Sequence, residues 1–161
     1  LKNKGQQFAL TTDFAEATCS DEIKVRVKAT KYAVIEDAEG SGQSEMKWWG
    51  KVTGDGGLDC MLINQSNIVK LKSIYEKSYD PAGECVFTFP TGEPMSFTIH
   101  HWSGEYTNGG KLETDASDYQ KYTYDPEDGT FSPPLGGYML EAYKSDWTDL
   151  RTRMWGQVSL D

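Results

Sequence analysis

Strict alternation of apolar and polar residues is the strongest pattern in the chain. In the stretch IKVRVK at 23–28, every second residue is apolar and the residues between are basic. Period-two alternation predicts a half-buried strand, because successive side chains of a strand point to opposite faces. The same alternation, or a short apolar run, recurs at 50–52, 58–63, 69–75, 85–89, 95–102, 119–124, 137–143 and 150–160.

Turn signals separate these stretches. Glycine, proline and aspartate cluster at 54–57, 80–83 and 125–129, where they favour tight turns. A helix competes with a strand only in the window 66–78. We therefore predict an all-β fold, an antiparallel sandwich of two sheets with about eight strands.

The chain of 161 residues has the length of one domain. We interpret residues 1–20 as an irregular lead-in or linker and residues 21–161 as a single β-sandwich domain. No apolar run approaches the roughly 18 residues of a membrane-spanning helix, so no transmembrane segment is predicted. The chain begins at Leu1, and we expect a processed chain or part of a larger protein.

The formal net charge is −9. This charge argues against binding to nucleic acid, whose phosphates attract clustered lysine and arginine. The basic residues are instead scattered over the polar faces of predicted strands, as is typical of a solvated surface. The acidic excess suits a secreted or cell-surface protein, or one that binds cations.

Three cysteines, Cys19, Cys60 and Cys85, allow at most one disulfide. None has the close paired spacing of a zinc site. Cys60 and Cys85 both lie in apolar alternating stretches, which is typical of buried free thiols. The sequence leaves their pairing open.

The sequence contains no nucleophile-elbow, zinc-protease or phosphate-loop motif. His100 and His101 are adjacent on a predicted strand, so their side chains face opposite sides and cannot chelate one metal together. We expect one histidine in the interior, the other at the surface, and a structural role for both. Two carboxylates in a cleft would suffice for glycoside hydrolysis, which we keep only as a third alternative.

Acidic residues gather in two predicted loops, 36–45 and 103–118. Calcium takes six to eight oxygen ligands, largely carboxylates and carbonyls of flexible loops. The candidate calcium ligands are Asp37, Glu39, Glu45, Glu105 and Asp115. The alternative is that these are ordinary hydrated charges.

Tryptophan supplies the second candidate site. Trp48 and Trp49 are adjacent on a predicted strand and must face opposite sides, so one of them lies outside the core unless a loop covers it. Trp102 ends another predicted strand. Exposed aromatic rings stack on sugars or lie at a membrane interface. The candidate ligand-binding residues are therefore Trp48, Trp49 and Trp102, unless the outer ring is merely covered by a lysine stem.

The order of these features resembles the C-two domains, calcium- and lipid-binding β-sandwich modules first described in protein kinase C. An acidic, glycine-bearing loop followed by the aromatic pair and Gly50-Lys51-Val52 is similar to that family's first calcium loop. The stretch IHHW at 99–102, followed by acidic residues, is similar to its later strand and loop. The resemblance implies that Asp37 and Glu45 bind calcium together with Glu105 and Asp115.

We thus expect a non-enzymatic binding or targeting module of a secreted or cell-surface protein. Calcium held by the acidic end loops would let it bind a membrane lipid or a protein partner. The alternative is a carbohydrate-binding or adhesion module that binds a glycan through exposed aromatic residues.

Overall fold

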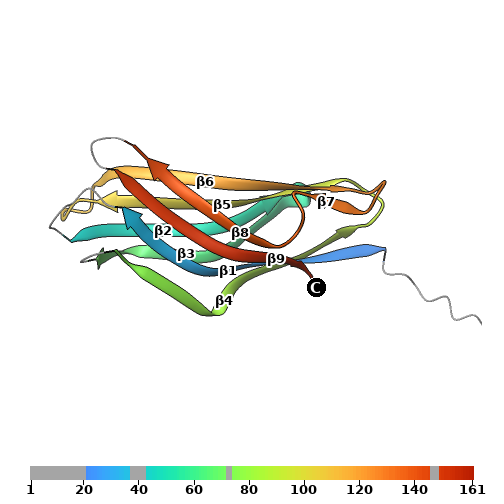
Figure 1. Ribbon diagram of the computed structural model, residues 1–161, viewed down its shortest axis with the longest axis horizontal. Helices are drawn as coiled ribbons and strands as arrows, with labels where there is room; N and C mark the ends of the chain where they lie inside the picture. The colour runs from blue at the N-terminus through green and yellow to red at the C-terminus, as the bar shows by residue number, and fades with distance from the viewer. Residues whose placement is uncertain (1–20, 37–42, 72–73, 146–148) are drawn as a thin grey trace, which may run out of the picture.

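The computed structural model describes residues 21–36, 43–71, 74–145 and 149–161. In this part of the chain, nine strands and one short 3-10 turn make up most of the structure (Figure 1). They are β1 (Glu22–Glu36), β2 (Ser44–Gly54), η1 (Asp55–Gly57), β3 (Leu58–Leu71), β4 (Glu76–Pro90), β5 (Met95–Tyr106), β6 (Leu112–Asp125), β7 (Thr130–Ser132), β8 (Gly137–Lys144) and β9 (Leu150–Leu160).

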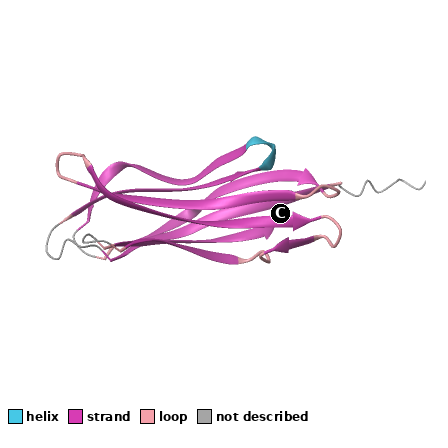
Figure 2. Ribbon diagram, turned by 90° about the horizontal axis from the view of Figure 1, so that it is seen from above, coloured by secondary structure: helices cyan, strands magenta, loops and turns pink. Residues whose placement is uncertain are grey.

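The strands form two antiparallel sheets packed face to face (Figures 1 and 2). The order is β4-β1-β9-β8 in the four-stranded sheet and β3-β2-β5-β6-β7 in the five-stranded sheet. The start of β1 pairs with the end of β9, and the Asp161 amide donates a hydrogen bond to the Lys24 carbonyl at 2.9 Å. The predicted all-β sandwich is confirmed, with nine described strands where about eight were expected.

Several strands are longer than the sequence pattern indicated. The predicted strands at 58–63 and 69–75 are largely one continuous element, β3, whose pairing with β2 has two irregularities. The described part of 66–78, where a helix competed, includes the end of β3 and the start of β4. β5 and β6 also run into the predicted acidic loop at 103–118 and leave only 107–111 between them.

Apolar side chains from alternate strand positions fill the space between the sheets. Val25, Val27 and Ala29 of β1 are fully buried, as the alternation predicts. Trp48 is also fully buried and stacks on Tyr32, with ring centroids 4.2 Å apart and an interplanar angle of 9°. Its indole N–H donates to the Tyr79 hydroxyl at 2.9 Å, so its one polar atom is satisfied.

A small polar network lies inside this apolar core. His101 Nε2 is 3.0 Å from the Thr152 hydroxyl, which is 2.8 Å from the Ser103 hydroxyl, and Tyr32 extends the chain. Burial lowers the pKa of His101 to about 4, so the ring is neutral at pH 7. His100 faces the other side of β5 and is partly exposed, so the predicted split of the two histidines is confirmed.

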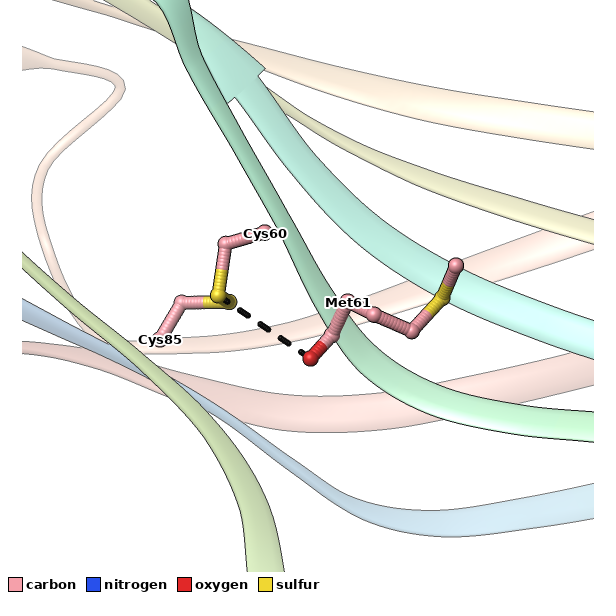
Figure 3. Close-up of a disulfide and its surroundings, with 3 residues drawn as sticks. All are labelled: Cys60, Met61 and Cys85. Atoms are coloured by element: carbon pink, nitrogen blue, oxygen red, sulfur yellow. Dashed lines mark hydrogen bonds between the residues drawn. A yellow bond between two sulfur atoms is a disulfide. The ribbon is translucent and has the colours of Figure 1, made fainter.

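One disulfide joins the sheets. Cys60 of β3 and Cys85 of β4 are bonded, with their Cα atoms 6.0 Å apart (Figure 3). Of the alternatives that the sequence left open, the structure contains the disulfide, and neither Cys60 nor Cys85 is a free thiol. β3 and β4 are edge strands of different sheets, and the sandwich brings these two edges together. Cys19 lies outside the described residues.

Candidate functional site

The outward side of the five-stranded sheet carries a row of aromatic and basic side chains. Alternation along β2 and β5 places them on one side, and the register aligns them: Trp49 pairs with Trp102, and Lys51 pairs with His100. On the next strand, Tyr119 pairs with His100. We call this surface the tryptophan face; it comprises Lys47, Trp49, Lys51, His100, Trp102, Tyr106, Asp115 and Tyr119.

Trp49 and Trp102 form the centre of the tryptophan face. Both are partly exposed, and their rings are nearly parallel, with an interplanar angle of 16° and centroids 6.1 Å apart. This separation exceeds that of directly superposed rings, so the two indoles are offset and each leaves part of its face uncovered by the other. The pair therefore presents apolar aromatic surface on a rigid sheet.

Two neighbours hold the Trp102 ring in place. Its Nε1–H donates to Asp115 Oδ2 at 2.9 Å. A Cβ at Gly104 would lie 2.5 Å from Cη2 of the same ring, so the indole occupies space that any other residue at 104 would fill. The orientation of Trp102 is thus fixed by a hydrogen bond on one side and a glycine beneath it.

Polar groups flank the two rings. The Lys51 ammonium lies 5.4 Å from the Trp49 ring centroid, and that of Lys47 lies 4.7 Å from the Tyr106 centroid. His100 Nε2 is 2.9 Å from the Thr53 hydroxyl. Burial and then the nearby charge of Lys51 lower the pKa of His100, which favours a neutral ring at pH 7. Tyr119 is 67% exposed at the edge of the face.

The tryptophan face leads into an open polar pocket of about 560 Å³. Tyr106 belongs to both, and the other lining residues are Gln43, Glu45, Thr107, Asn108, Gly109 and Glu113. Lys70 helps to shape the pocket, because its ammonium is 3.5 Å from Glu45 and 3.2 Å from the Asn108 side chain. Hydrogen-bonding groups therefore continue beyond the aromatic surface.

Of the five carboxylates predicted to bind calcium, the three that the structure describes do not converge on one point. Asp37 and Glu39 lie outside the described residues. Glu45 is buried beside Lys70, and Asp115 accepts the Trp102 hydrogen bond. Glu105 is only 2% exposed and faces inward, because β5 continues where a loop was expected. Among the residues that the structure describes, no three His, Cys, Asp or Glu side chains form a metal-binding group.

The predicted aromatic site is assembled in part. Trp49 and Trp102 meet on the outward face, whereas Trp48 is buried in the core and has no ring surface for an external ligand. Lys47 and Lys51 were not among the predicted site residues, although both lie two residues from Trp49 and so share its side of β2. Tyr119 could be found only from the pairing of β5 with β6.

Comparisons with protein families and with curated proteins identify no relative from which a function could be transferred. Within the described ranges, no helix is long and apolar enough to cross a membrane. No protein-family model matches the chain, and no curated protein matches it either. Function must therefore be inferred from the chemistry of the tryptophan face itself.

Proposed function

We propose that the chain is a non-enzymatic module of a secreted or cell-surface protein and binds a neutral glycan on the tryptophan face. One observation carries the proposal: Trp49 and Trp102, from separate strands, lie side by side and partly exposed on the outside of the sheet. Large apolar rings grouped at a surface mark binding sites more often than they mark a solvated face.

Sugar rings match this surface in shape and chemistry. A pyranose ring has an apolar face of C–H groups that packs against an indole, while its hydroxyls need donors and acceptors at the edge. The tryptophan face supplies lysine donors at Lys47 and Lys51, and His100 and Asp115 add further polar atoms. The adjoining polar pocket would accommodate additional hydroxyls of a longer chain.

Charge favours a neutral glycan over an acidic one. The net charge of −9 repels polyanions at long range. Near the rings, the positive charges of Lys47 and Lys51 are offset by Asp115 and, in the polar pocket, by Glu113. A neutral sugar meets neither a strong attraction nor a strong repulsion, so stacking decides its binding.

Calcium-dependent binding of a membrane lipid or protein partner stays a prediction. Two of its expected ligands lie outside the described residues, and the other three carboxylates do not converge. The same experiment separates the two hypotheses, because a chelator abolishes calcium-dependent binding and leaves stacking on Trp49 and Trp102 intact.

The test is affinity electrophoresis and calorimetry against a panel of neutral polysaccharides, with calcium and with a chelator. We expect retention that the chelator does not change. Trp49→Ala and Trp102→Ala should each weaken binding by about 2 kcal/mol, roughly 30-fold, as for a buried aromatic hot spot. The matched control is Trp155→Ala, since Trp155 is also partly exposed and lies 4.9 Å from a lysine ammonium, but on β9.

Two results would contradict the proposal. Equal losses in the Trp155→Ala control and in the Trp49→Ala variant would show that the tryptophan face is not the site. Retention that disappears in the chelator would favour the acidic loops instead.

A further inference from the structure

A second pocket lies at the other end of the sandwich from the polar pocket. It has a volume of about 340 Å³ and is lined by η1, the end of β4 and the turn before β5. Figure 2 shows η1, in cyan, at the upper margin of the sandwich, short of the strand ends on that side. We call this second pocket the edge pocket; its lining residues include Asp55, Leu58, Phe87, Phe89, Glu93 and Met95.

The floor of the edge pocket is apolar and well supported. Phe87 packs edge-on against Phe97, with ring centroids 5.1 Å apart. Phe89 packs in the same way against Tyr124 at 5.2 Å, and it is buried. Aromatic pairs in this geometry stabilise each other beyond the burial of their surface, so the floor is preformed before any ligand arrives.

The disulfide fixes the distance between β3 and β4, the two edge strands that flank the edge pocket. Leu58 is two residues from Cys60 on β3, and Phe87 is two residues from Cys85 on β4. Each of these two lining residues is therefore the same-side neighbour of a bonded cysteine along its strand. The opening between the two edge strands cannot widen freely, and the pocket keeps a defined size.

The rim of the edge pocket is negatively charged. Asp55 Oδ2 accepts a hydrogen bond from the Ser96 amide at 2.8 Å, which holds that carboxylate at the mouth. Glu93 is exposed on the adjoining turn. Among the described residues that line the pocket, none is lysine or arginine. An apolar floor with two carboxylates at its mouth is complementary to a cation with an apolar body.

We infer that the edge pocket binds a small organic ammonium ion whose apolar group is about the size of one aromatic ring. The apolar group lies against Phe87 and Phe89, and the ammonium donates to Asp55 and Glu93. The volume is at the lower end of that found for small-molecule sites, which suits a single ring rather than a peptide segment. The inference is independent of glycan binding.

The experiment titrates the whole chain with three probes of similar size and follows the amide NMR spectrum. The probes are phenethylamine, the neutral phenethyl alcohol and the anionic hydrocinnamate. We expect phenethylamine to shift the resonances of the edge pocket saturably, and the alcohol to bind about tenfold more weakly, since it lacks a charged hydrogen bond. Hydrocinnamate should not bind.

Charge-removing variants locate the contact. Asp55→Asn keeps an acceptor for the Ser96 amide and removes the charge, and Glu93→Gln does the same at the turn. Each should weaken phenethylamine binding several-fold, while the control Glu127→Gln, in the turn between β6 and β7, leaves it unchanged. Trp49→Ala should also leave it unchanged, which keeps this test separate from that of the tryptophan face.

Three outcomes would overturn the inference. The first is that no probe shifts the resonances of the pocket. The second is that phenethylamine and phenethyl alcohol bind with equal affinity. The third is that neither Asp55→Asn nor Glu93→Gln weakens phenethylamine binding while both variants retain a dispersed spectrum.

Discussion

The two outward faces of the sandwich are built on the same alternation but carry different chemistry. On the four-stranded sheet, Arg26 lies 2.7 Å from Glu84 and 2.6 Å from Asp161. Lys31 lies 2.8 Å from Glu76. On the five-stranded sheet, outward-facing positions hold the stacked Trp49 and Trp102.

The difference separates a charge-paired face from the face that we propose as the binding site. Paired opposite charges at a surface contribute little stability, yet they keep the sheet hydrated around Arg26 and Lys31, and the exposed apolar side chains of this sheet, such as Val86 and Met139, do not form a stacked pair. Partly exposed indoles do the reverse, because their apolar surface remains in contact with water until something covers it. The tryptophan face is thus the outward surface on which two partly exposed indoles lie together.

The strongest test of this contrast is removal of both rings. Trp49→Ala with Trp102→Ala should cost about 4 kcal/mol of glycan binding, roughly a thousandfold in affinity, if their contributions add. Trp155→Ala on the four-stranded sheet should cost nothing measurable. Calorimetry on all three proteins checks this, and a double variant that still binds with the original affinity would end the distinction between the faces.

The next effect concerns the link between the two sheets. Cys60→Ser with Cys85→Ser removes a cross-link of sequence separation 25, and a chain-entropy estimate gives a loss of about 3.5 kcal/mol in unfolding free energy. For a domain of this size that lowers Tm by roughly 10 °C. Thermal melts with and without a reductant measure it. A reductant should destabilise the parent chain and leave the double serine variant unaffected.

Acid should destabilise the sandwich through His101, directly behind the tryptophan face. The folded pKa of about 4 lies below the ordinary value of 6.5, so the unfolded chain takes up a proton that the folded chain refuses. The contribution of His101 is fully present above pH 6.5 and is lost as the pH falls from there towards 4. We expect a loss of about 2 kcal/mol by pH 5 from this residue.

Denaturant unfolding between pH 7 and pH 5 checks this expectation, with variants of the two adjacent histidines as the comparison. His101→Gln should flatten the dependence on pH. His100→Gln, on the partly exposed side of β5, should retain most of it. If the two variants behave alike, burial of His101 is not the cause.

The smallest effect should come from the charged face. Arg26→Gln breaks two exposed ion pairs, and we expect only a slight decrease in Tm. High salt screens the same ion pairs in the parent chain, so it should remove the Tm difference between the parent and the variant. Glycan affinity should be unchanged. A change in that affinity would show that the two faces are coupled through the core.

Single-strand patterns predicted the fold class and the side to which many residues point. The alternation at 23–28 places Val25 and Val27 inside, and adjacency alone put Trp48 and Trp49 on opposite sides. Both follow from the two-residue repeat of a strand, which is a local property. A local property of this kind can be predicted from the sequence without knowing the partner strands.

Which strands pair with one another could not be predicted from the sequence. Trp49 meets Trp102, and Cys60 meets Cys85, only because of which strands are neighbours and in what register, and this depends on packing over the whole sandwich. The expected loop position of Glu105 depended on a strand boundary. Once β5 continues to Tyr106, alternation turns Glu105 inward and away from Asp115.

The pairing of β1 with β9 has a mechanical consequence. Because Asp21 and Asp161 lie at the same end of this antiparallel pair, tension between them would load its hydrogen bonds one after another, as in peeling, rather than all together in shear. The first contacts under load are those of Asp161 with Lys24 and Arg26. A tether at this end would load the start of β1 and the end of β9, at the opposite end of the sandwich from the end of β5 (Figure 1).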